Sequence, residues 1–85
     1  MSNVIWKYPL HSSDSRIKMP CGAMVLHIHE QGGLPCLWVL VDPEQPQETR
    51  RFVTYGTGHP LPEGRRLYLG TFHLEAGSLV YHVFE

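Results

Sequence analysis

A chain of 85 residues suits one small domain, and its 42% hydrophobic and 18% charged residues exclude a disordered protein. The formal net charge of −1 gives no field that would attract nucleic acid or an anionic membrane surface. No apolar run reaches the about 18 residues of a membrane span, and the first ten residues lack a signal-peptide pattern. We therefore expect a single β domain over residues 1–85 that acts in the cytoplasm, without a membrane or nucleic acid partner.

Apolar and polar residues alternate in short runs bounded by Gly and Pro, and no segment has a helical period. The runs predict seven strands, at residues 3–10, 15–19, 23–31, 34–42, 49–56, 65–74 and 78–85. The segment VDPEQPQETR, residues 41–50, is expected to be a polar loop. Six to seven short strands in one small domain indicate an all-β fold, either a small antiparallel β-sandwich or a partly open barrel.

Two glycines, Gly32-Gly33, predict a two-residue turn between the third and fourth strands. That turn would pair His29 with Cys36 and His27 with Trp38, and further along Val25 with Leu40. The opposite face of this hairpin is wholly apolar and is the core candidate: Met24, Leu26, Ile28, Leu37, Val39 and Val41.

A second turn is predicted at Ala76-Gly77, between the last two strands. It would put four apolar side chains on the inward face of the hairpin: Phe72, Leu74, Leu79 and Tyr81. His73 and His82 would share the other face. The last strand has to be held by pairing, either inside a sheet or at an edge with a second chain.

Three potential metal ligands lie close together in the first hairpin, since His27 and His29 point to one side of a strand and Cys36 faces them. A structural zinc site normally has four ligands, so a half-exposed sheet face is the favoured interpretation and no metal or other cofactor is predicted. Cys21 and Cys36 lack CxxC spacing and are expected to be reduced thiols.

The segment YGTGHPLPEGRR, residues 55–66, is the best candidate for a ligand site. Its glycines let backbone N–H groups approach a ligand, and arginine forks suit phosphate or carboxylate groups. The spacing matches neither a P-loop nor a dinucleotide-binding fingerprint, and a plain connector is the alternative. The predicted ligand-binding residues are Gly56, Thr57, Gly58, His59, Arg65 and Arg66.

Nine aromatic residues are more than a domain of this size is expected to bury completely. Aromatic side chains are enriched at protein interfaces, so some of them are expected to form a partner surface, most simply in a homo-oligomer. The predicted surface residues are Trp6, Tyr8, Trp38, Tyr81 and Phe84. Alternatively, Trp6 and Trp38 only cover the open side of a sheet.

Catalysis finds little support in the chain, because no nucleophile elbow and no pair of carboxylates stands out. We expect a protein that is not an enzyme. A small metal- or thiol-dependent enzyme built around His27, His29 and Cys36 stays as an alternative.

The stretches IWKYPL, LPCLWVLVDP, GTGHPLP, YLGTFHL and LVYHVFE together resemble a family of small uncharacterised proteins of bacteriophages, prophages and bacterial genomes. The resemblance covers nearly the whole chain and carries no assigned site residue. It implies a phage or mobile-element accessory protein in the cytoplasm of a bacterial host. Such a protein would counteract a defence system by sequestering a small anionic, nucleotide-like signal or by blocking a host defence protein; a virion or assembly protein is the rival class.

Overall fold

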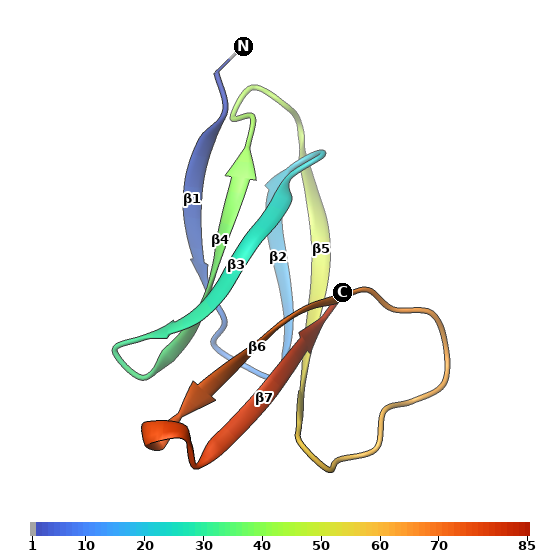
Figure 1. Ribbon diagram of the computed structural model, residues 1–85. Helices are drawn as coiled ribbons and strands as arrows, with labels where there is room; N and C mark the ends of the chain where they lie inside the picture. The colour runs from blue at the N-terminus through green and yellow to red at the C-terminus, as the bar shows by residue number, and fades with distance from the viewer. Residues whose placement is uncertain (1) are drawn as a thin grey trace.

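The computed structural model describes residues 2–85, which form seven β-strands (Figure 1). The elements in chain order are β1 (Val4–Pro9), β2 (Asp14–Pro20), β3 (Met24–Gln31), β4 (Leu34–Val41), β5 (Gln47–Gly56), β6 (Tyr68–Leu74), the short 3-10 turn η1 (Glu75–Gly77) and β7 (Leu79–Phe84). The predicted all-β class is confirmed, and every expected strand is present within a few residues of its expected bounds. No helix among residues 2–85 has the length and apolar character needed to cross a membrane.

The strands form two antiparallel sheets that do not close into a barrel. One sheet has the order β1-β4-β3, and the other has the order β2-β5-β7-β6 (Figure 1). The last strand, β7, therefore lies inside a sheet, and it pairs with β5 on one side and β6 on the other. Leu67 and Glu85 extend this pairing, since each backbone N–H donates to the carbonyl of the other at 2.9 and 2.8 Å.

The core lies between the inner faces of the two sheets. Its fully buried side chains come from β2 (Met19 and Pro20), β4 (Leu37, Val39 and Val41), β5 (Phe52) and β7 (Val83). The sheets come close together at Gly70 of β6, where an added Cβ would lie 3.3 Å from Ile28 Cδ1 of β3. A glycine at this position lets the two layers approach without a clash.

The β3–β4 hairpin confirms the predicted turn, because Gly32 and Gly33 both have positive φ, as a type I′ turn requires. The predicted register holds from the turn to the His27–Trp38 pair.

Beyond that pair the prediction is wrong, because a β-bulge interrupts the register between Val25 and His27. The extra residue exchanges the two faces of the strand. Val25 packs against the core, whereas Met24 and Leu26, both expected inside, are 59% and 46% exposed.

The β6–β7 hairpin has the predicted register, with Leu74 opposite Leu79 and Phe72 opposite Tyr81. Phe72 is buried, and Leu74 and Tyr81 pack against the core, so the expected inward face is confirmed for these three residues. Leu79, at the end of the hairpin, is exposed.

The connector between β4 and β5 is shorter than expected. Asp42 holds its turn by accepting hydrogen bonds from the Glu44 N–H and the Gln45 side chain, at 3.1 and 3.3 Å. β5 already begins at Gln47, which pairs with Pro20 of β2. Residues 47 and 48, expected in the loop alone, are therefore strand, because β2 supplies a pairing partner that local composition does not reveal.

Candidate ligand-binding site

The glycine-rich segment after β5 is a tight turn. The His59 N–H donates to the Gly56 carbonyl at 3.1 Å, and Gly58 has a φ of 87° at the position where a type II turn favours glycine. The His59 ring folds back over Gly56, where an added Cβ would lie 3.0 Å from its Cε1 and Nδ1 atoms. The two glycines are thus needed for the shape of the turn itself.

Two backbone donors predicted to bind a ligand are used inside the protein. The Thr57 N–H donates to the Val80 carbonyl at 3.1 Å, and the His59 N–H closes the turn. The Thr57 hydroxyl also donates to the Val80 carbonyl at 3.1 Å. These contacts fasten the turn to β7 and leave it little capacity to cradle a phosphate.

A polar row on the outer face of the four-stranded sheet continues from this turn. The Thr57 hydroxyl, which lies 3.1 Å from the Val80 carbonyl, is also hydrogen-bonded to His82 Nε2 at 2.7 Å. His82 Nδ1 is hydrogen-bonded to the Thr71 hydroxyl at 2.9 Å, and Thr71 is hydrogen-bonded to the Tyr68 hydroxyl. A continuous hydrogen-bonded row therefore runs from the turn across β7 to β6.

The structure divides the six predicted ligand residues between two surface hollows. The first, called here the turn hollow, has a volume of 480 Å³ and is lined by Gly56, Thr57, His59, Ser78, Leu79, Val80 and Tyr81. The second, the arginine hollow, has a volume of 230 Å³ and is lined by Arg51, Val53, Tyr55, Pro62, Arg65, Arg66, Phe84 and Glu85. Gly58 lines neither.

The separation follows from the strand directions: β5 and β6 both run antiparallel to β7, so the end of β5 and the start of β6 lie at opposite ends of the sheet. On one face of β7, His82 lies between Val80, which lines the turn hollow, and Phe84, which lines the arginine hollow. One small ligand can therefore contact either the glycine-rich turn or the arginines, but not both.

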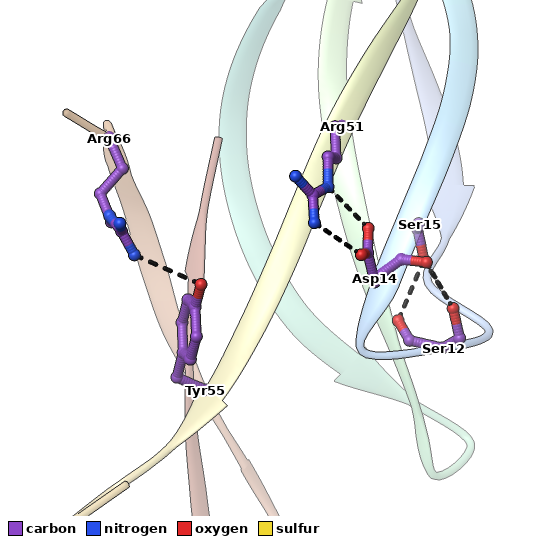
Figure 2. Close-up of polar contacts among 6 residues, drawn as sticks. All are labelled: Ser12, Asp14, Ser15, Arg51, Tyr55 and Arg66. Atoms are coloured by element: carbon purple, nitrogen blue, oxygen red, sulfur yellow. Dashed lines mark hydrogen bonds and ion pairs between the residues drawn. The ribbon is translucent and has the colours of Figure 1, made fainter. Parts of the chain in front are cut away.

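Three arginines from two parts of the chain line the arginine hollow, and Figure 2 shows two of them, Arg51 and Arg66. Arg66 donates to the Tyr55 hydroxyl at 3.3 Å and to the Glu63 carbonyl at 3.2 Å, and its guanidinium lies 5.9 Å from the Tyr55 ring centre. Arg65 is exposed and has no hydrogen bond or ion pair within residues 2–85. Arg65 is thus the arginine most available to a ligand.

Arg51 lies at the opposite side of the hollow and is paired with a carboxylate of β2. Its Nε and Nη2 donate to the two oxygens of Asp14 at 2.9 and 2.7 Å (Figure 2). These hydrogen bonds lower the pKa of Asp14 and raise the pKa of Arg51. The pair is exposed, so solvent weakens the attraction and Arg51 retains donors for an anion.

Arg50, the neighbour of Arg51, points to the other face of β5 and does not join this group. Its guanidinium donates to both carboxylate oxygens of Glu85, at 2.6 and 2.8 Å, and to the Ala23 carbonyl. Hydrogen bonding to Glu85 raises the pKa of Arg50. Although Glu85 lines the arginine hollow, its charge is already neutralised by Arg50.

Aromatic rings form an apolar wall beside the arginines. Phe84 packs against Tyr55 and Tyr68, with ring centres 5.8 and 5.4 Å apart. Arg51 and Tyr55 were not among the predicted ligand residues. Period-two alternation along β5, which puts residues 51, 53 and 55 on one face, is the sequence signal that could have found them.

The five aromatic residues predicted to form one partner surface lie on separate faces. Trp6 and Tyr8 point to the inner side of β1, and Trp38 pairs with His27 on the outer side of the same sheet. Tyr81 packs against the core, and Phe84 lines the arginine hollow. Among the described residues they do not form a single patch.

The first hairpin places its potential metal ligands as the register predicted. The His27 and His29 rings stack with centres 5.9 Å apart, and Cys36 faces His29 but is buried, its thiol donating to the Leu34 carbonyl. No three His, Cys, Asp or Glu side chains in the described part of the chain are arranged to hold a metal ion.

The fold and this site together define a class: a small protein of two antiparallel β-sheets with an arginine-lined, aromatic-walled hollow on one outer face. A family model described as "Domain of unknown function (DUF7352)" matches residues 1–85, and the chain belongs to that family. No curated protein and no solved structure matched the chain. The expected membership of an uncharacterised family is confirmed.

Proposed function

We propose that this protein is a non-catalytic binding protein that captures a small anionic ligand in the arginine hollow. The observation that carries the proposal is the convergence of Arg51, Arg65 and Arg66 on one hollow, with Arg65 lacking any partner among residues 2–85. A guanidinium fork donates two parallel hydrogen bonds to a phosphate or carboxylate group.

The aromatic wall favours a nucleotide-like anion over a simple ion. Phe84 and Tyr55 stand beside the arginines, and aromatic faces and guanidinium planes both stack on nucleobases. The hollow has a volume of 230 Å³, below the about 300–1,000 Å³ of typical ligand pockets. It suits one phosphate group, with the rest of the ligand lying on the half-buried rings of Tyr55 and Phe84.

The biological setting that we propose is a phage or mobile-element accessory protein in the cytoplasm of a bacterial host. Its support is the resemblance of five sequence stretches to small phage and prophage proteins. In that setting, capture of a nucleotide signal would deprive a host defence system of its activator. The two parts of the proposal are separable, because ligand capture can be tested without knowing the source.

The test is a thermal-unfolding panel with inorganic phosphate, pyrophosphate, mononucleotides and cyclic dinucleotides. A ligand that binds only the folded state raises Tm with increasing concentration. We expect such a rise with at least one phosphorylated ligand, and we expect it to shrink at high ionic strength. No rise with any of these ligands would contradict the proposal.

Substitutions then locate the site. Arg65→Ala should abolish the ligand-dependent rise and leave the Tm of the free protein unchanged, because Arg65 has no partner in the described structure to lose. Lys18→Ala is the control, since Lys18 is an exposed cation of β2 that lies opposite Thr49 and does not line the hollow. Equal losses in the two variants would show that net charge, and not this hollow, attracts the ligand.

A further inference from the structure

β1 is one free edge of the three-stranded sheet, and the charge and the proline that it carries, Lys7 and Pro9, both lie in its second half. A β-bulge interrupts β3, and a register shift between Tyr68 and Gly70 interrupts β6. β2 presents alternating exposed charges at Asp14, Arg16 and Lys18. Bulges, edge charges and prolines are the usual means of preventing strand addition, so the first half of β1, Val4 to Trp6, is the edge segment most open to it.

The backbone of β1 shows which groups face outward. The Leu10 N–H donates to the Pro35 carbonyl at 2.8 Å, and this pair continues the β1–β4 register. Hydrogen-bonded and non-hydrogen-bonded pairs alternate in an antiparallel ladder. Val4, Trp6 and Tyr8 therefore direct their N–H and carbonyl groups at β4, while Ile5 and Lys7, with Asn3 before them, direct theirs away from the sheet.

The side chains of β1 leave apolar surface uncovered on both sides of the sheet. Ile5 is 57% exposed on the outer side, and Val4 and Trp6 are 38% and 40% exposed on the inner side. On the outer side, Ile5 lies in one cross-strand row with Leu40 of β4 and Met24 of β3. This apolar row stops abruptly at the free edge.

We infer that the β1 edge binds a second copy of this chain, with the two β1 strands antiparallel about a two-fold axis at Ile5. In this register Ile5 lies opposite Ile5 of the second copy, and Asn3 lies opposite Lys7. The residues with outward backbone groups then meet one another and exchange both hydrogen bonds of each pair. The two sheets become one continuous six-stranded sheet.

The same register gives each exposed apolar side chain of β1 an apolar partner. Val4 pairs with Trp6 of the second copy on the inner side, and Trp6 pairs with Val4. On the outer side, the Ile5 pair joins the two Ile5–Leu40–Met24 rows into one. Neither lysine faces the other, so the interface is free of like-charge repulsion.

Shifts of the register are less favourable for identifiable reasons. A shift of the axis to Trp6 puts Ile5 opposite Lys7, and a shift to Lys7 puts the two lysines directly opposite each other. A shift that exchanges the inner and outer sides would place the two molecules on opposite faces of the joined sheet. Of these registers, only the one with its axis at Ile5 pairs the outward backbone groups with each other, gives each apolar side chain an apolar partner and keeps the two lysines apart.

The dimer should be reversible, because three partly exposed side chains per copy fall short of a standard interface of about 800 Å² per partner. Sedimentation velocity of the full chain over a wide concentration range should show a monomer–dimer equilibrium. A monomer at every concentration would overturn the inference.

Ile5→Lys should give a monomer with an unchanged fold, because it sets two charges against each other only in the dimer. Leu61→Lys is the matched control: it adds the same charge at an exposed leucine in the loop before β6, and it should leave the dimer intact. Persistence of the dimer in Ile5→Lys would overturn the inference.

Cysteine cross-linking tests the register directly, in a Cys21→Ser background that removes the more accessible native thiol. Directly opposed residues of a hydrogen-bonded pair have Cα atoms about 5.5 Å apart, within the range of a disulfide. Ile5→Cys should therefore form a covalent dimer on oxidation, and Lys7→Cys should not. Cross-linking through Lys7→Cys instead would show that the two-fold axis lies elsewhere.

Discussion

The two sheets of this protein share one core but differ in their outer faces. On the three-stranded sheet, apolar side chains point outward in the row Ile5–Leu40–Met24. On the four-stranded sheet, the corresponding face has arginines, Tyr55 and the hydrogen-bonded row through His82. An outward apolar row is suited to another protein surface, and an outward row of donors is suited to a polar ligand.

The difference also separates the two proposed activities in space. β1 lies at one side of the molecule, and the loop that contributes Arg65 and Arg66 lies at the opposite side (Figure 1). Strand addition at β1 would therefore leave the arginine hollow open. A variant that no longer dimerises through β1 should still bind the ligand, and a variant that no longer binds the ligand should still dimerise. The two proposals can therefore be tested independently.

The largest expected change in the free energy of unfolding comes from a substitution in the core that the two sheets share. Phe52→Ala should lower the free energy of unfolding by about 3–5 kcal/mol, because Phe52 is fully buried between the sheets. Met24→Ala is the outward control and should change it by no more than about 0.5 kcal/mol. Urea unfolding measures both; a large loss in Met24→Ala would mean that the outer apolar row is already covered.

An intermediate loss of stability is expected at β5, where substitution of the two neighbouring arginines should have unequal effects. Arg50→Ala removes a largely buried pair with Glu85 and the bond to the Ala23 carbonyl, and should cost about 1–3 kcal/mol. Arg51→Ala removes an exposed pair and should cost clearly less. Thermal unfolding of the two variants makes the comparison; equal losses would contradict the difference in burial.

The smallest expected effect on stability concerns Asp14, whose carboxylate accepts two hydrogen bonds from the Arg51 guanidinium. The pKa of Asp14 is lowered from 3.8 in the folded protein, chiefly by its hydrogen bond to Arg51. Asp14 therefore stabilises the fold above its ordinary pKa, and this contribution is lost as pH falls through the lowered value. The stability difference between wild type and Asp14→Asn should be small and should vanish in acid, as pH-dependent unfolding can show.

The same substitution has a predicted effect on the ligand. Asp14→Asn frees Arg51 and removes a negative charge near the hollow, so a phosphorylated ligand should bind several-fold more tightly. Titration calorimetry at neutral pH gives the comparison. Weaker binding in Asp14→Asn would mean that Asp14 holds Arg51 in the orientation that the ligand requires.

Much of the fold could be predicted from residue types. Gly32-Gly33 and Ala76-Gly77 marked two turns, and each turn set the register of its hairpin near the turn. The pattern could not reveal the bulge at Leu26, which moved Met24 outward and Val25 inward. A bulge depends on how the strand twists over the opposite sheet, and the apolar composition of β3 allows either face to be buried.

The candidate site was predictable only in part. Arg65 and Arg66 stood out as cations beside a glycine-rich loop, but their separation from Thr57 and His59 did not follow from spacing. The sequence left open whether the strands on either side of the loop were neighbours. In the structure β5 and β6 both run antiparallel to β7, so the loop returns along the sheet and its arginines meet Arg51 and Tyr55 instead of the turn.

Residue types and local order by themselves determined the strand content, the hairpins near their turns and the glycine-rich connector, because alternation and glycine turns act over a few residues. Only the tertiary structure decided which strand stands at an edge and which side chains share a hollow. These depend on pairing between segments far apart in the chain, such as β5 with β7 and β1 with β4. The glycine-rich turn is consequently anchored to β7, and the arginines that follow it face a different hollow.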